Sequence, residues 1–133
     1  MVGNSTTSTS FVDVTGHTAT ITPTAATSKI LIMYSCFTYH SNTGRIRPLN
    51  LVRDGSNICQ PASGTEPATM NPYLGASLGV QHAVVNFLDS PATTSAVVYK
   101  IQIKTDVGTV YVGRDSGTVS AAPANLTLME LSA

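Results

Sequence analysis

The sequence predicts an all-β fold, an antiparallel β-sandwich of about eight or nine short strands. Thr, Val and Ile dominate the apolar and β-branched segments, and no segment repeats apolar residues at helical spacing over more than two turns. Residues 97–104 alternate apolar and polar side chains, which is typical of a half-buried antiparallel strand. Turn-forming Gly, Pro, Asn and Asp residues interrupt the apolar runs roughly every 8–12 residues. We expect one domain over residues 1–133, with residues 1–9 as a short lead-in.

The expected strands follow from these apolar runs and the turns between them. Asp54-Gly55 is a two-residue hairpin signal that separates residues 49–53 from Ser56–Cys59. Pro48 marks a bulge or an edge strand within Arg45–Arg53, because proline has no N–H to donate to a ladder. The remaining strands are expected at Phe11–Val14, His17–Thr22, Lys29–Tyr39, Gln81–Leu88, Val97–Lys104, Thr109–Gly113 and Asn125–Leu131.

The strand expected at Lys29–Tyr39 is apolar on both faces. Its β-branched and aromatic content favours a strand over the alternative of a short buried helix. One sandwich partner covers only one face, so a neighbouring subunit is a natural partner for the other. We therefore predict that Ile32, Met33 and Tyr34 contribute to the interface of a homotrimer.

Residues 60–78 form the one long irregular stretch in this reading of the sequence. The segment contains Pro61, Gly64, Pro67, Pro72 and Gly75, which break regular structure. A loop of this length in a compact domain is usually functional or disordered.

Composition excludes several classes of function. Seven basic residues balance seven acidic residues, whereas a general nucleic-acid binder or a polybasic membrane-surface module needs a basic footprint. No apolar run approaches the roughly 20 residues of a membrane span, and the first residues lack the features of a signal peptide. Two cysteines, Cys36 and Cys59, do not make a disulfide framework, so we expect free thiols in a chain that folds in a reducing cytoplasm. A single bridge is the alternative if their strands pair.

The residues that commonly carry catalysis or bind metals form no recognisable motif. His17, His40 and His82 lack metal-ligand spacing, and no nucleophile elbow or phosphate loop is present, so we predict no catalytic residue, no metal and no cofactor. A Cys/His dyad is the alternative, but Cys36 lies in the most apolar strand, where a thiol is inert. His82 alternates with Val80, Val84 and Leu88, which predicts a core or interface histidine.

Two acidic residues are expected to have structural roles. Asp89, before Ser90-Pro91, is expected to cap its own backbone in a turn. Glu130 is expected to pair with a cation, for which Lys29, Arg45, Arg47 and Arg53 are the candidates.

An ordered series of short motifs resembles a domain of tailed-phage tail fibres, especially marine and cyanobacterial ones. The motifs are Ser8–Gly16, Ala19–Thr24, Thr27–Ile32, Val52–Ser56, Leu88–Ala96, Tyr99, Gly108–Val110 and Leu126–Leu131. The resemblance covers most of residues 5–133, but residues 59–80 match nothing in the family. It implies a C-terminal, trimeric jelly-roll head on the virion surface, similar in build to tumour-necrosis-factor-like trimers.

The resemblance leads to three hypotheses about function. A host-recognition fibre tip would bind a host glycan or outer-membrane receptor, and a capsid decoration protein would bind the shell. Family members usually follow a long shaft, whereas this chain begins shortly before Phe11, so it is either a fibre fragment or a free-standing virion protein. A small polysaccharide-acting enzyme would need two close carboxylates, and the seven acidic residues are scattered along the chain.

Receptor contact is expected to centre on the irregular stretch, because binding residues concentrate on loops held by a rigid scaffold. Asn71 and Tyr73 are the main candidates, with Met70, His40 and Asn42 beside them. Tyrosine offers a flat apolar face with a polar group, and asparagine offers a paired donor and acceptor suited to sugar hydroxyls. The alternative is that Tyr73 and Met70 tuck under the loop and close the end of the sandwich.

Overall fold

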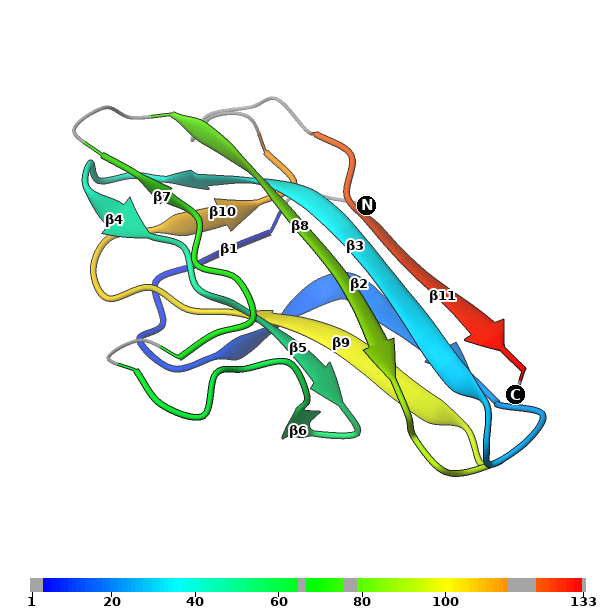
Figure 1. The fold of residues 1–133 in the computed structure, drawn as a ribbon. Coiled ribbons are helices and arrows are strands. Elements are labelled where there is room, and N and C mark those ends of the chain that lie inside the picture. Colours follow the sequence, from blue (N-terminus) through cyan, green and yellow to red (C-terminus); the bar gives the residue numbers. More distant parts are fainter. Residues whose placement is uncertain (1–3, 65–66, 76–78, 115–121, 133) are drawn as a thin grey trace.

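Two curled antiparallel sheets face each other in the computed structural model, which describes residues 4–64, 67–75, 79–114 and 122–132 (Figure 1). A third, two-stranded sheet lies at one end of the pair. The described part of the chain contains strands and no helix. The all-β prediction is confirmed, and the arrangement is that of a β-sandwich.

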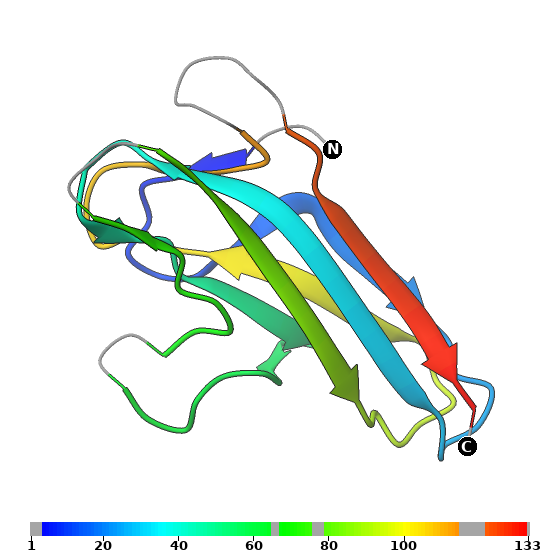
Figure 2. The same ribbon diagram turned by 45° about the horizontal axis from the view of Figure 1, so that its top comes forward.

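The five-stranded sheet is organised around β3 (Lys29–His40). One edge of β3 pairs with β8 (Val80–Asp89) along nearly its whole length. The other edge pairs first with β11 (Asn125–Leu131) and then, over residues 38–40, with β10 (Val110–Val112). The strand β1 (Asn4–Thr6), which falls in the expected lead-in, pairs with β10. Both edges of β3 are thus occupied (Figure 2).

The four-stranded sheet runs in the order β2 (Val12–Ile21), β9 (Val97–Ile103), β5 (Leu49–Arg53) and β6 (Ser56–Asn57). The two strands expected at residues 11–14 and 17–22 are one strand, β2, whose register with β9 shifts between Asp13 and Thr18. Residues 104–109 carry the chain from β9 across to β10 in the other sheet.

The strand run expected at residues 45–53 is divided between two sheets. The strand β4 (Arg45–Ile46) pairs with β7 (Tyr73–Leu74) in the two-stranded sheet, and β5 belongs to the four-stranded sheet. Pro48 lies in the break between β4 and β5, where its missing N–H costs no ladder bond. Its carbonyl oxygen accepts a hydrogen bond from Lys104 N at 3.3 Å.

The hairpin predicted at Asp54-Gly55 is present between β5 and β6. Arg53 pairs with Ser56, and Asp54 and Gly55 both have positive φ, at 47° and 87°. Two consecutive positive φ angles define the tight primed turn that matches the twist of the strands.

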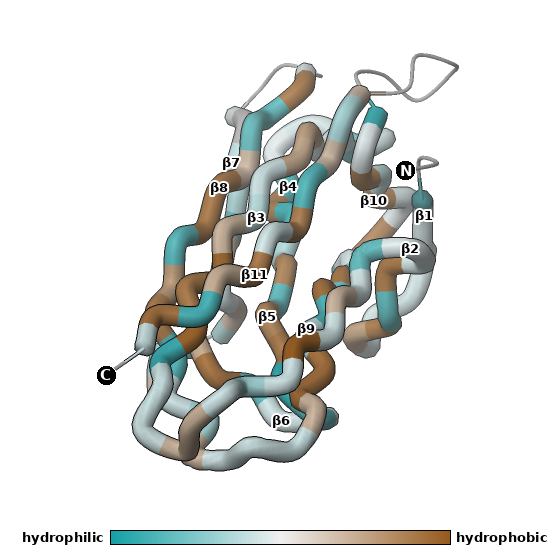
Figure 3. Tube along the Cα trace, turned by 90° about the vertical axis from the view of Figure 1, so that its right-hand side faces the viewer, coloured by the Kyte–Doolittle hydropathy of each residue, from teal (hydrophilic) through white to brown (hydrophobic). Residues whose placement is uncertain are grey.

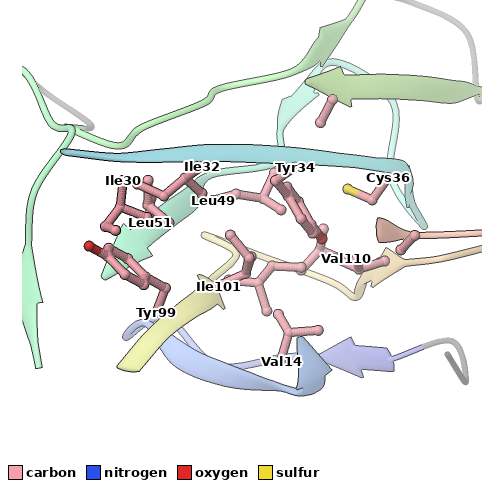
Figure 4. Packing of buried hydrophobic residues seen from close by; sticks show 14 of the residues in the cluster. Val14, Ile30, Ile32, Tyr34, Cys36, Leu49, Leu51, Tyr99, Ile101 and Val110 are labelled. Carbon is pink, nitrogen blue, oxygen red and sulfur yellow. The ribbon is translucent and has the colours of Figure 1, made fainter. Parts of the chain in front are cut away.

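The core lies between the two large sheets. In Figure 4, Ile30, Ile32 and Tyr34 of β3 point toward Tyr99 and Ile101 of β9. Tyr99, Ile101 and Ile103 face inward from β9, as their alternation with Lys100 and Gln102 predicts. Cys36 is buried in this core and Cys59 is half-buried, and both are free thiols in the structure.

His82 does not lie in the core, so that part of its prediction is wrong, whereas an interface position for it stays a prediction. His82, Val84 and Leu88 are exposed, and Ala83 is buried opposite Cys36. The His82 ring stacks on Phe37 with ring centroids 4.8 Å apart. Because β8 carries apolar residues on both faces, alternation alone does not fix its register, and pairing with β3 decides it.

Asp89 does not cap its own backbone. It is 7% exposed, lies 2.8 Å from Arg53 Nη1 of β5, and accepts a hydrogen bond from the Tyr99 hydroxyl at 2.7 Å. Burial, followed by the hydrogen bond and charge of Asp89, raises the pKa of Tyr99. This cluster joins β8 to β5 and β9 across the sandwich.

Glu130 does not pair with any of the four expected cations. Its Oε1 accepts hydrogen bonds from the backbone N and the Oγ1 of Thr24, both at 2.7 Å. Hydroxyl groups of Ser28 and Thr24 lower the pKa of Glu130. The carboxylate therefore anchors the connection between β2 and β3.

An outer apolar face covers the side of the five-stranded sheet that points away from the core. Alternation along β3 directs Ile32 and Tyr34 inward, where they are buried, and Met33 outward. Hydrophobic segments recur along β8, β3 and β11 in Figure 3. We define the outer apolar face by Leu31, Met33, Val84, Leu88, Met129 and Leu131, of which the last four are 41–51% exposed.

Candidate binding site at the β4–β7 end

Two segments that are far apart in sequence lie side by side at one end of the sandwich. Ile46 pairs with Tyr73, Gly44 N donates to Gly75 O at 2.8 Å, and Arg47 N donates to Pro72 O at 2.9 Å. Residues 41–44 and 71–75 therefore form one surface, which we call the β4–β7 end (Figure 1).

Tyr73 is the most exposed large hydrophobic side chain among the described residues, at 57%. Asn71 and Asn42 are also exposed. A Cβ built on Gly44 would lie 4.0 Å from the Tyr73 hydroxyl, so this hydroxyl reaches the 41–44 turn. The structure thus brings the predicted Tyr73 to the same surface as Asn42, and the alternative of a tucked Tyr73 is wrong.

Met70 has a different environment from Tyr73. Its backbone exchanges two hydrogen bonds with Leu49, at 2.9 and 3.0 Å, and its side chain packs partly buried against the core. Thr69 lies along the same edge of β5, because its Oγ1 accepts a hydrogen bond from Leu51 N at 2.8 Å. Met70 therefore packs against the core, and its predicted role in closing the end of the sandwich stays a prediction.

His40 is fully buried and supports the 41–44 turn from within. Its Nδ1 accepts a hydrogen bond from Asn42 N at 2.9 Å, and its Nε2 donates to Thr105 Oγ1 at 2.8 Å. Thr105 Oγ1 in turn donates to Val107 O at 2.8 Å. Burial, and then the charge of Arg47, lower the pKa of His40, so a neutral imidazole holds this chain of bonds.

Gly108 allows the 105–109 turn to approach the 41–44 turn closely. Its φ is +71°, and an added Cβ would overlap the side chain of Asn42. Ser41 Oγ donates to Asn42 Oδ1 at 2.8 Å and accepts from Thr109 N at 2.9 Å. These contacts fix the position of Asn42 directly after β3, the strand with both edges paired.

Charged groups for which the sequence predicts no site role also lie at the β4–β7 end. Arg45 Nη1 lies 2.7 Å from Asp106 Oδ2, with both side chains about two-fifths exposed. Arg47 is 1% exposed, and its Nη2 donates to Gly79 O at 3.2 Å. Its Nε and Nη1 have no hydrogen-bond partner within the described ranges. The spacing Arg45-Ile46-Arg47 before a proline is the one sequence signal of this cluster.

The part of the chain that the structure describes contains neither a cluster of metal ligands nor a membrane-spanning helix. No three His, Cys, Asp or Glu side chains there could hold a metal ion. No helix there is long and apolar enough to span a bilayer. Burial raises the pKa of Cys36 to about 11, so its thiol is protonated and unreactive at neutral pH.

No protein-family model matches the chain, and no curated protein matches it either. The function proposed below therefore depends on the geometry of these residues and on the ordered motifs of the sequence.

Proposed function

We propose that the chain is the head of a phage tail fibre and that its β4–β7 end attaches the virion to the host surface. The observation that carries this proposal is the exposed Tyr73, whose hydroxyl reaches the 41–44 turn that contains Asn42 at one end of a β-sandwich. Aromatic rings and amide groups are suited to sugar faces and hydroxyls, and a pre-formed site loses little entropy on binding. The motifs that resemble fibre heads support the same placement on the virion surface.

The proposed head is a homotrimeric jelly roll. The outer apolar face supports assembly, because four apolar side chains there are more than two-fifths exposed. A shallow depression of about 190 Å³ lies on the same face, between Met33, Val84 and Thr127. Copies of the chain, the fibre shaft or other virion proteins would cover this face.

A capsid decoration protein is the second candidate function. The outer apolar face favours it, because a protein seated permanently on a shell needs a large apolar contact. The two candidates differ in what the β4–β7 end does, since only a fibre head uses that end for adsorption.

Adsorption of the labelled protein tests the proposed function. We expect the chain to bind cells on which its phage grows and not to bind isolated capsids. Tyr73→Ala and Asn71→Ala should weaken cell binding without changing the melting temperature. Thr20→Ala, at an exposed position of β2, is the control and should leave cell binding intact. Binding to capsids alone would replace the fibre head with the decoration protein.

A further inference from the structure

His40 is the last residue of β3, and its side chain connects the 41–44 turn to the turn after β9. Its Nδ1 lies 2.9 Å from Asn42 N, and its Nε2 lies 2.8 Å from Thr105 Oγ1. The ring is fully buried, so its two nitrogens depend on these partners. One imidazole therefore joins two turns that are 65 residues apart in the sequence.

The hydrogen bonds around this ring are compatible with one protonation state. Asn42 N–H is always a donor, so Nδ1 must offer its lone pair. A neutral imidazole with an unprotonated Nδ1 carries its proton on Nε2, and this N–H donates to Thr105 Oγ1. The Thr105 hydroxyl donates in turn to Val107 O at 2.8 Å. Every donor in this chain of bonds has an acceptor while Nδ1 is unprotonated.

Charged groups on three segments act on the ring. Burial, and then the charge of Arg47, lower the pKa of His40, and Arg45 of β4 lowers it further. Asp106, after β9, and the backbone of Asn42 act in the opposite direction, but the net change in pKa is downward. The strand β10, whose inward side chains are valines, adds no charge. The folded chain therefore favours the neutral ring at neutral pH.

A proton on Nδ1 changes the hydrogen bonding as well as the charge. It places a donor on each side of the 2.9 Å contact between His40 and Asn42, with no lone pair between them. The bond is then lost, and the buried Nδ1–H is left without an acceptor, which is unfavourable. The imidazolium can be satisfied only if the 41–44 turn moves and lets water or another acceptor reach Nδ1. Acid therefore acts on the backbone of this turn.

The 41–44 turn is part of the β4–β7 end. Gly44 N donates to Gly75 O at 2.8 Å, and a Cβ built on Gly44 would lie 4.0 Å from the Tyr73 hydroxyl. Within the turn, Ser41 Oγ donates to Asn42 Oδ1 at 2.8 Å. A displacement of the turn therefore changes the position of Asn42 relative to Tyr73.

We propose that His40 is an acid-sensitive switch, in which protonation of Nδ1 releases the 41–44 turn and weakens binding at the β4–β7 end. The two states are the neutral ring, which holds Asn42, and the imidazolium, which does not. Because the folded pKa of His40 lies below 6.5, the turn is held at neutral pH and is released as pH falls through that pKa. The inference rests on the proposed function and deepens it, because it names a regulation of the same site.

Titration of the full chain by nuclear magnetic resonance tests the proposal. The probes are the ring carbons of His40 and the backbone amide of Asn42, followed from about pH 7.5 to about pH 4. We expect both signals to titrate with one midpoint, below pH 6.5, while the amide of the buried Ile101 keeps its neutral-pH position. Separate midpoints, or an Asn42 amide that changes only when the whole chain unfolds, would overturn the proposal.

Two asparagine variants show whether His40 is the source of the pH dependence. His40→Asn supplies an amide oxygen that can accept from Asn42 N and does not titrate, so the pH dependence of the Asn42 amide should disappear. His82→Asn changes an exposed histidine of β8 and should leave that pH dependence unchanged. A pH dependence that survives in a folded His40→Asn variant would contradict the switch. If this variant does not fold, the comparison of midpoints in the unmodified chain decides.

Cell adsorption above and below the shared midpoint tests the effect on binding. One pH unit below the midpoint about one ring in eleven is neutral, so binding that needs the neutral ring should weaken about tenfold. Equal adsorption at the two pH values would overturn the regulatory role. A chain in which His40 and Asn42 titrate together but which adsorbs at neither pH keeps the switch and loses the fibre-head role.

Discussion

Single residues in this chain have roles set by the space and the polarity around them. Gly55 and Gly75 illustrate the difference, since an added Cβ meets no atom of the described residues within 4 Å at either position. Only Gly55 has a positive φ, of 87°, which side chains rarely adopt. The cost of a substitution at Gly55 is therefore conformational and not steric.

We expect Gly55→Val to lower the free energy of unfolding by about 1–2 kcal/mol, because the primed turn forces valine into the left-handed region. Gly75→Val is the matched control, and we expect a smaller change there. Denaturant unfolding of both variants checks this prediction. Equal losses would show that φ does not determine the cost.

His17 is a second residue whose surroundings determine its chemistry. It is fully buried, with Nδ1 2.8 Å from the Tyr34 hydroxyl, and its Nε2 has no partner in the described part of the chain. Burial lowers the pKa of His17 below its ordinary 6.5. The unfolded chain then binds a proton that the folded chain resists.

The buried imidazole of His17 predicts a loss of stability in acid. Because the folded pKa lies below the unfolded one, its contribution is complete above about pH 6.5 and is lost as pH falls toward the folded pKa. We expect His17→Gln to reduce the slope of the free energy of unfolding against pH between about pH 6.5 and pH 5. An unchanged slope would exclude His17 as the source, leaving His40, whose pKa is also lowered.

At the scale of elements, ion pairs differ in what they connect. Asp89 of β8 pairs with Arg53 of β5, and its side chain is 9% exposed. Asp13 of β2 pairs with Lys100 of the neighbouring β9, and both side chains are more than one-third exposed. The first pair joins the two sheets, whereas the second lies on the surface of one sheet.

We expect Asp89→Ala to destabilise the protein by about 3 kcal/mol, since it leaves Arg53 and the Tyr99 hydroxyl without their acceptor. Asp13→Ala should cost less than about 1 kcal/mol, as exposed pairs do. Thermal or denaturant unfolding of the two alanine variants measures the difference. Similar losses in both variants would contradict a special role for Asp89.

Local patterns predicted the strands well but not their partners. The Asp54-Gly55 hairpin and the inward face of β9 follow from a few adjacent residues, and both are confirmed. Strand pairing depends on contacts far apart in the sequence, so the separation of β9 from β10 and of β4 from β5 could not be predicted. The side of β8 that points inward could not be predicted, because apolar residues occupy both of its faces.

The candidate site was predicted in part for the same reason. Tyr73 and Asn42 lie on segments recognisable as loops or turns, and the structure places them on one surface. The burial of His40 and Arg47 depends on segments that pack over them, which composition does not reveal. Buried cations are usually paired, so composition offers no reason to expect that Arg47 lacks an ion pair among the described residues.

At the scale of the whole molecule, the outer apolar face lies on the opposite side of β3 from the buried core. Ile32 and Met33 are adjacent in β3, but Ile32 is buried in the core and Met33 points to the outer apolar face. Charge introduced on the two sides should therefore have different consequences. This contrast allows the proposed trimer to be tested without unfolding the protein.

We expect the chain to be a trimer by light scattering coupled to size exclusion at about micromolar concentration. Leu88→Asp, on the outer apolar face, should dissociate the trimer into folded monomers, because its 45% exposure gives the charge access to water once the partner leaves. Ile32→Asp should unfold the chain, since an unpaired buried charge costs several kcal/mol. Val12→Asp, at a 37% exposed position of the other sheet, should leave both the fold and the trimer intact. A monomeric parent chain would exclude the trimer, and a trimer that survives Leu88→Asp would move its interface away from the outer apolar face.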